Sequence, residues 1–346
     1  MHAGTIRRAL CLFVGGAVIV GGASQSHAQP SGVPTGFSPH IQPVKGGEVD
    51  WGNGFLIVHG EGRARGRSSR DRLMAERAAS LVAARNALAT SMRIQVDADG
   101  TFATVRDGSV HIRGRVKGQK VTSADWRPDE NPPACRVKMR VPLWGLKGLG
   151  AVVYDRERRE ANGHRGERIA LSEDRIDVRK YWLIVDARGL QISPCLFPVI
   201  VDDTGRTLYD IGAVETPRNA VIRPVGYAET TMSWTELEEW AEHGEAGSDS
   251  DIGAEQRTDT DGQLVPQLTE AQAGRSSTSL NSRRVGIGPR RGWVVRASKT
   301  AASGNGDIVL ETAVAEQLAK SPKQSSLLRN GRVIIVVDSA TRVGQP

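Results

Sequence analysis

Residues 55–66, FLIVHGEGRARG, place three glycines in a run that alternates small and charged side chains. The even-numbered positions Val58 to Gly66 are mostly small, whereas the odd-numbered positions from Glu61 onward are charged. A period of two belongs to a β-strand rather than to a phosphate-binding loop. A dinucleotide-binding turn would also need glycine where this chain has Arg65. We therefore expect a strand whose glycines allow the close approach of other backbone.

A helix is expected directly after this strand, from about Arg70 to Met92. Ser68 and Ser69 are suitable N-cap residues, and apolar residues then recur at helical spacing. The recurring residues are Met74, Ala78, Leu81, Leu88 and Met92. The sequence thus predicts a long helix lying across the sheet, over the glycines.

Three later segments also alternate with a period of two: Ile94–Ala98, Val110–Gln119 and Cys135–Leu143. Such segments are typical of strands with one buried face, which are mostly antiparallel. The expected fold class is α+β. It consists of a two-layer β-α-β-β-β domain with one long helix on an antiparallel-rich sheet, followed by a second β-rich α+β domain.

The chain begins like an exported protein, because Arg7 and Arg8 precede an apolar core and the small-x-small site Ser26-His27-Ala28. No later apolar run approaches the ~20 residues needed to span a bilayer. Few large apolar residues lie between 242 and 291, too few to order that span. The expected organisation is a signal peptide at 1–28, a flexible leader at 29–53, the α+β domain at 54–149, a charged linker at 150–180, a second β-rich domain at 181–241 and 292–340, and a disordered insertion at 242–291.

The strand register predicts a basic sheet face opposite the helix. Its expected members are Arg63, Arg65, Arg67, Arg113, Arg115, Lys117, Arg136, Lys138 and Arg140, with His111 beside them. Like charges opposite one another across strands repel, so something should offset them. Two interpretations stay open: acids on neighbouring elements balance a solvated face, or the face binds an anionic lipid, envelope polymer or acidic protein. Nucleic acid is not expected, because the chain is exported and the face lacks aromatic residues for base stacking.

No residue set in the chain predicts catalysis, and no cofactor or metal site is expected. The histidines are dispersed without metal-ligand spacing. Asp186 and the pair Asp202-Asp203 could act as acid/base carboxylates, but Asp202-Asp203-Thr204-Gly205 is more typical of a turn between strands. Cys135 and Cys195 could form a disulfide or remain buried free thiols.

Four segments carry a family resemblance: "VHGEGRARG", "AERAASLVAARNALATSM", "VRDGSVHIRGRVKGQKV" and "CRVKMRVPLWG". Together they make residues 54–145 resemble the domain of the twenty-kilodalton membrane-associated lipoprotein family, which is similar to the N-terminal part of flagellar assembly protein T. The resemblance implies an envelope-located α+β domain with structural or assembly roles and supplies no catalytic residues. Unlike those lipoproteins, this chain has no cysteine at the cleavage site.

The sequence favours an exported, non-catalytic cell-envelope protein with a structural or assembly role. We expect it in the periplasm or otherwise exported, with association to the outer membrane left open. Its expected partners are envelope proteins or an anionic envelope surface. One alternative is a binding module for an anionic partner on the basic sheet face. A second alternative is an enzyme with its site in the Tyr181–Tyr227 block.

Overall fold

The computed structural model describes residues 33–105, 112–114, 116, 119, 121–163, 166–217, 220–243, 292–301 and 306–339. Residues Ser31–Pro346 form one compact unit. The expected signal peptide at 1–28 and residues 244–291 of the expected insertion lie outside the described residues. Among the helices of the described residues, none has the length and apolar character that a membrane crossing requires.

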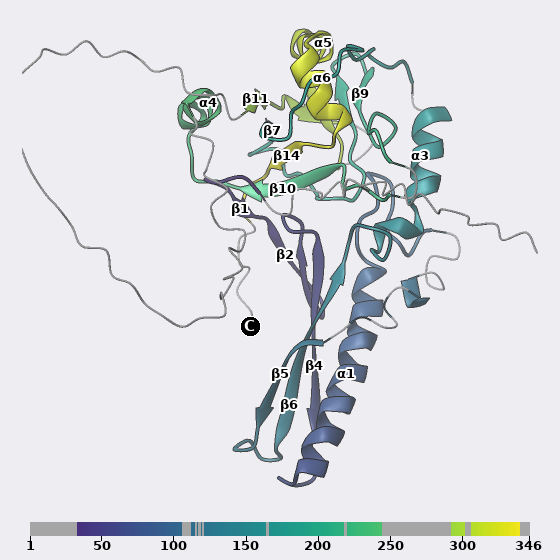
Figure 1. Cartoon of the computed structure of the whole chain (residues 1–346), viewed down its shortest axis with the longest axis vertical. Coiled ribbons are helices and arrows are strands. Elements are labelled where there is room, and N and C mark those ends of the chain that lie inside the picture. The colour runs from purple at the N-terminus through teal and green to yellow at the C-terminus, as the bar shows by residue number, and fades with distance from the viewer. Residues whose placement is uncertain are drawn as a thin grey trace, which may run out of the picture. The chain divides into compact units, whose positions relative to one another are not determined.

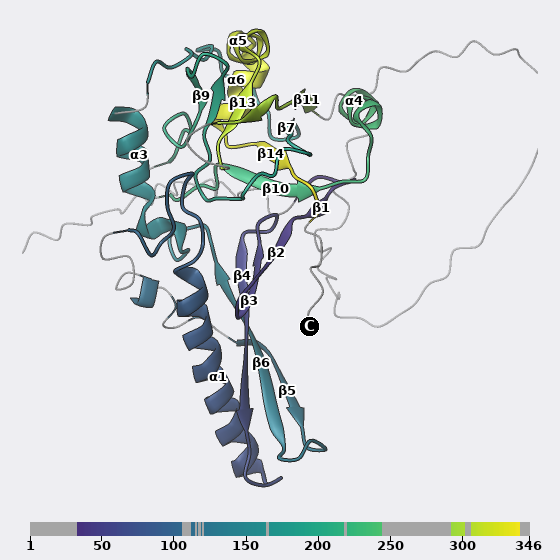
Figure 2. The ribbon, with the colours of Figure 1, turned by 180° about the vertical axis from the view of Figure 1, so that it is seen from behind.

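The first sheet has five strands in the order β2-β3-β4-β6-β5, and all its pairings are antiparallel. Its strands are β2 (Ile41–Val44), β3 (Gly47–Asp50), β4 (Phe55–Arg63), β5 (Val121–Arg127) and β6 (Ala134–Pro142). The helix α1 (Ser69–Ser91) runs along β4 and β6 on one face of this sheet (Figures 1 and 2). This confirms the expectation of an α+β fold with one long helix on an antiparallel-rich sheet.

The expectation of a flexible leader at 29–53 is wrong for residues 33–53, which the structure folds. β2 and β3 form a hairpin through a turn in which Gly46 has a φ of +96°. Val49 and Trp51 from this segment are 1% and 3% exposed. The burial of these side chains orders the segment despite its proline- and glycine-rich composition.

Two expected strands are also wrong. Ile94–Ala98 contributes a single bridge, between Gln95 and Thr101, rather than a strand. In Val110–Gln119, the described residues 112–114 and 116 are helical. Ile112 and Val116 are both buried, and a spacing of four residues places them on one side of a helix as readily as on one side of a strand.

The glycines of β4 pack against the backbone of α1. A Cβ on Gly60 would lie 2.1 Å from the carbonyl oxygen of Ala79, and one on Gly62 would lie 2.1 Å from that of Ala75. The helix face toward the strand is a buried stripe of small residues: Ala75, Ala79, Ala83 and Ala87. Glycine opposite alanine therefore lets helix and strand approach closely, as the sequence predicted.

The rest of the described chain forms two further sheets: a five-stranded sheet with mainly parallel pairing and a four-stranded sheet in which β8 and β13 are parallel and the other two pairings are antiparallel. One has the order β1-β10-β14-β7-β11, with β10, β14, β7 and β11 parallel; the other has the order β12-β13-β8-β9. The first of these contains β1 (Ser38–Pro39), β7 (Trp182–Asp186), β10 (Val225–Glu229), β11 (Gly292–Arg296) and β14 (Val333–Val336). The second contains β8 (Ile200–Asp202), β9 (Thr207–Tyr209), β12 (Lys299–Thr300) and β13 (Ile308–Leu310).

Short helices accompany these sheets. They are the 3₁₀ helix η1 (Gly150–Val152), α3 (Tyr154–Gly163), α4 (Trp234–His243), α5 (Thr312–Lys320) and α6 (Pro322–Arg329). The segment 150–180, expected as a charged linker, contains η1 and α3. Its later part is bound to α6, because the Ile176 N–H donates a hydrogen bond to the Ser326 Oγ at 3.0 Å.

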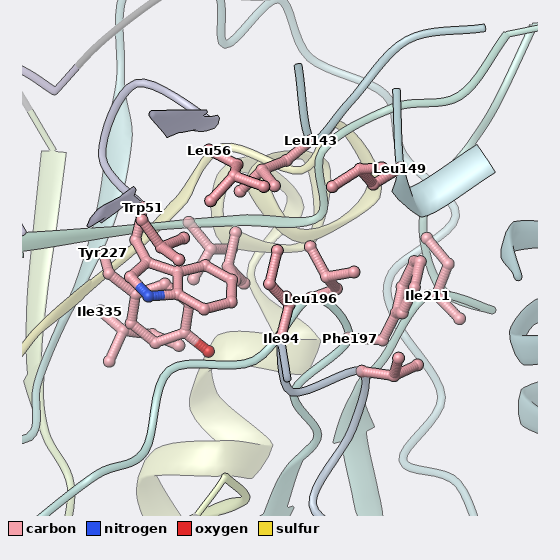
Figure 3. Close-up of a cluster of buried hydrophobic side chains, with 14 of the residues drawn as sticks. Trp51, Leu56, Ile94, Leu143, Leu149, Leu196, Phe197, Ile211, Tyr227 and Ile335 are labelled. Atoms are coloured by element: carbon pink, nitrogen blue, oxygen red, sulfur yellow. The ribbon is translucent and has the colours of Figure 1, made fainter. Parts of the chain in front are cut away.

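The first sheet and the parallel sheet share one hydrophobic core. Figure 3 shows Trp51, from the segment that ends the β2–β3 hairpin, beside Tyr227 and Ile335 of the parallel sheet, and Leu56 of β4 belongs to the same buried cluster. The Trp51 and Tyr227 rings meet edge to face, with centroids 5.7 Å apart. Backbone hydrogen bonds add to this contact, since the Leu196 N–H donates to the Gln95 carbonyl at 3.1 Å. The two regions are thus joined by packing as well as by the chain between them.

Candidate functional site

Four of the nine predicted basic residues share the sheet face opposite α1. Arg63 lies on β4, and Arg136, Lys138 and Arg140 lie on β6. Their neighbours along β6, such as Val137, are buried against the helix. We call the shared face of β4, β6 and β5 the outer sheet face.

The structure does not bring the other five basic residues onto this face. Arg65 and Arg67 lie in the bend between β4 and α1, because the strand ends at Arg63. Arg113 is exposed in the helical segment that replaces the expected strand. Arg115 and Lys117 lie outside the described residues.

Acidic residues offset much of the remaining positive charge. The Arg136 Nε lies 3.0 Å from Glu61 Oε2, and its Nη2 lies 3.3 Å from Glu130 Oε1. The Arg63 Nε is 3.5 Å from the second oxygen of Glu61. The hydrogen bond from Arg136 is the main cause of the lowered pKa of Glu61. Of the two interpretations left open by the sequence, the pairing of charges favours a solvated face balanced by acids.

A smaller cationic area is left on the outer sheet face. Lys138 lies opposite His59 in the β4–β6 register, and Arg140 lies opposite Ile57. The Arg140 guanidinium is 3.9 Å from the centre of the Phe55 ring, so it covers apolar surface as well as carrying charge. Lys138 and Arg140 are the best-placed residues for an anionic contact on this face.

The side of α1 turned away from the sheet exposes large apolar residues. The exposed fractions are 55% for Leu73, 57% for Met74, 74% for Leu81 and 37% for Val82. We call Met74 and Leu81, with Leu73 and Val82 at the two margins, the outer face of α1. Ala78 lies toward β4, because its Cβ is 3.0 Å from where a Cβ on Gly62 would lie. The sequence predicted Met74 and Leu81 as part of the regular apolar pattern, but it did not show that they face away from the sheet. Exposed apolar residues grouped on one surface are typical of interaction sites.

The steric contact at the glycines explains this orientation. Side chains larger than alanine at positions 79 and 83 would not fit between α1 and β4, because a Cβ on Gly60 would already clash there. The larger apolar residues of the helix therefore lie on its other side. The glycines of β4 were the available signal: whichever helix face packs on them must be made of small residues.

Carboxylates at the C-terminal ends of the parallel strands form structural hydrogen bonds. Asp186, which ends β7, accepts two hydrogen bonds from Arg188, from Nε and Nη2, each at 2.8 Å. Arg188 also donates to the Met232 carbonyl at 2.6 Å. Asp338, just after β14, accepts from the Gly189 N–H at 2.8 Å. These bonds fix the loop after β7, at an edge where ligands often bind in parallel sheets.

The pair Asp202-Asp203 forms the predicted turn. Asp202 Oδ1 accepts hydrogen bonds from the Thr204 N–H at 3.0 Å and the Arg206 N–H at 2.8 Å. Gly205 has a φ of +87°, the conformation that the turn needs from glycine. The turn joins the antiparallel strands β8 and β9. Asp202 is thereby used for local structure.

A pocket of about 130 Å³ lies beside the loop that follows α1. It is lined by Val96, Asp97, Asp99, Gly100, Thr101, Thr104, Val105 and Arg156. Asp97 Oδ1 already accepts from the Asp99 and Gly100 N–H groups, at 2.9 and 2.8 Å. Pockets for organic ligands usually measure about 300 Å³ or more, so this one suits at most a few waters or a small ion. No group of His, Cys, Asp or Glu that could hold a metal is found among the described residues.

Glu157 is a buried carboxyl near this pocket. It is 2% exposed and accepts a hydrogen bond from Arg156 Nε at 3.0 Å. Burial is the main cause of its raised pKa, and the charge of Asp97 raises the pKa further. The Arg156 bond acts in the opposite direction.

Both cysteines of the described chain are buried free thiols, so the disulfide considered from the sequence is not formed. Cys135 lies on β6, on the side that packs against α1. Cys195 lies beside Tyr227, whose hydroxyl accepts a hydrogen bond from the Cys195 N–H at 3.1 Å. Burial raises the pKa of both thiols above the usual value, which makes them poor nucleophiles at neutral pH.

One family model matches the part of the chain that contains the parallel strands. Residues 182–261 and 268–339 match the family model of the second domain of Treponema pallidum Tp0624. The match begins at the first residue of β7 and ends shortly after β14, so it includes the whole set of parallel strands. No curated protein matches the chain. The comparisons give no support to the resemblance of residues 54–145 to the lipoprotein family or to flagellar assembly protein T.

Proposed function

We propose that this protein is an exported, non-catalytic component of the cell envelope with a structural or assembly role. The observation that carries the proposal is the outer face of α1, where Leu81 is 74% exposed and Met74 57% exposed on a helix that packs closely on β4 and β6. A packed helix with exposed apolar residues is suited to contacts with another protein. The signal-like start of the chain agrees with an envelope location.

Binding of an anionic polymer or lipid on the outer sheet face is a second candidate. Lys138 and Arg140 support it, since neither is in an ion pair with a described residue. The ion pairs of Glu61 and Glu130 with Arg136 weaken it, because they remove positive charge from the same face. Retention on an anionic matrix that survives both high salt and the double change Lys138→Glu and Arg140→Glu would rule it out.

The test of the assembly role is crosslinking of the full chain in its own cells, followed by separation of envelope and cytoplasmic fractions. We expect the chain in the envelope fraction, crosslinked to a defined protein partner. A protein recovered free, monomeric and in the cytoplasm would contradict the proposal.

A further inference from the structure

We propose that the outer face of α1 binds an acidic amphipathic helix of a partner protein. This inference rests on the assembly role proposed above and specifies the surface and the chemistry of the partner. It combines two observations on one helix: exposed apolar residues two turns apart, and exposed arginines between them that form no ion pair with a described residue.

The apolar residues have the spacing of a helix–helix contact. Met74 and Leu81 are seven residues apart on one side of α1, and Leu73 and Val82 lie at the two margins of that side. Residues three, four and seven apart lie on one side of a helix and form the ridge that a second helix packs against. The exposed stripe occupies the first two-thirds of α1. Further along, Ala84, Leu88 and Met92 pack against the core and are only partly exposed.

The charges along this stripe are positive. Arg70, Arg77 and Arg85 are exposed, and none of them is in an ion pair with a described residue. The acids of α1 are less available, because Asp71 is bound by the Ser68 hydroxyl at 2.6 Å and Glu76 is half-buried. A partner with glutamate or aspartate beside its apolar residues would complement this surface.

The same arginines argue against the two other occupants. In a symmetric contact between two copies of the chain, Arg70, Arg77 and Arg85 of both copies would meet across the interface and repel. A membrane surface would tolerate the arginines, but helices that lie in a membrane interface separate a charged face from an apolar face. In α1, Arg77 is three residues from Met74 and four from Leu81, so the charge lies among the apolar residues on the same side.

The experiment places a photo-crosslinking amino acid at Leu81 in the full chain and irradiates its own cells. The control carries the same amino acid at Arg179, whose side chain is 87% exposed in the other region. We expect an adduct from Leu81 but not from Arg179. Sequencing of the attached peptide should reveal acidic residues and apolar residues at helical spacing. An adduct with a second α1, with lipid, or with a segment lacking acidic residues would overturn the inference.

A charge exchange then tests complementarity. A synthetic peptide of the crosslinked segment is titrated against the folded chain, and against the double change Arg77→Glu and Arg85→Glu. We expect the Kd to rise roughly tenfold, about 1.4 kcal/mol, and to recover when the facing acids of the peptide are changed to lysine. The control is Arg175→Glu with Arg179→Glu, an equal change of charge on other exposed arginines.

The outcomes separate this inference from the proposed function. If crosslinking from other positions captures an envelope partner while Leu81 gives no adduct, the surface is wrong and the assembly role stands. If no position captures a partner, both are wrong. The melting temperature of each variant should equal that of the wild type, because substitutions at exposed positions usually change stability little. A loss of binding can then be assigned to the contact and not to unfolding.

Discussion

The first sheet and the parallel sheet bury their apolar residues in opposite ways. In the first, β4 presents glycines to the alanines of α1, and larger side chains such as Leu81 remain outside. In the second, every residue of β7 and β14 is buried. One face of these strands packs into the main core through Leu183 and Ile335, and the other packs with α4 through Ile184 and Ile334.

Because of this difference, the first sheet and α1 offer an apolar surface for contacts, whereas the parallel sheet contributes mainly to stability. Parallel strands with both faces covered have no apolar residues left for a partner. Close packing of glycine on alanine buries backbone instead, and it leaves the larger apolar side chains of the helix available. The first region is therefore the better candidate for binding, and the second for support.

The largest expected effect is the loss of a large side chain from the parallel sheet. Leu183→Ala should reduce the free energy of unfolding by about 2 to 5 kcal/mol, because Leu183 is fully buried and the change leaves a cavity. The midpoint of urea unfolding measures this loss. A loss below about 1 kcal/mol would mean that the sheet is covered on only one face.

A smaller but still large effect is expected from adding one methyl group to the first sheet. Gly60→Ala should cost about 1 to 3 kcal/mol, because its Cβ would lie 2.1 Å from the Ala79 carbonyl oxygen and α1 would have to move. The matched control is Gly163→Ala at the end of α3, where a Cβ has no atom within 4 Å. Equal stability of the two variants would disprove the close contact of helix and strand.

The sequence predicted this contact because glycines two residues apart in a strand leave a gap that another backbone can fill. It did not predict which side of α1 fills the gap. The apolar pattern of Met74 and Leu81 suggested one side, whereas the steric limit at Gly60 selects the alanine side. Where the backbones come so close, side-chain size decides the orientation of the helix and hydrophobicity does not.

Other errors have equally local causes. Ile112, Gly114 and Val116 alternate like a strand, but Ile112 and Val116 are also four residues apart, so the same pattern suits the helical segment that forms. The hairpin of β2 and β3 was missed because its prolines and glycines suggested a flexible leader. The acids that offset the basic face could be predicted only in part. Glu61 is two residues from Arg63 in the same strand, so it was expected on the same face. Glu130 lies in the turn before β6, and the alternating pattern does not show that it contacts Arg136.

A pH-dependent effect of smaller size tests the buried carboxyl of α3. Burial raises the pKa of Glu157 in the folded state above the usual 4.5, so its contribution to stability is fully present below that value and is lost as the pH rises through the folded pKa. Glu157→Gln removes this dependence. Relative to the wild type, the variant should therefore be more stable at pH 7 than at pH 4. Thermal unfolding at both pH values measures the change, with Glu160→Gln, whose side chain is 52% exposed, as the control.

The smallest effect is expected for a leucine-to-alanine change on the outer face of α1, although the same type of change is the most damaging one in the parallel sheet. Leu81→Ala should change the free energy of unfolding by no more than about 0.5 kcal/mol, because Leu81 is 74% exposed and alanine is at least as good a helix former. Urea unfolding measured beside Leu183→Ala gives the comparison directly. A large loss at Leu81 would show that this side chain is covered within the folded chain, and the outer face of α1 would then be part of the core rather than a surface for a partner.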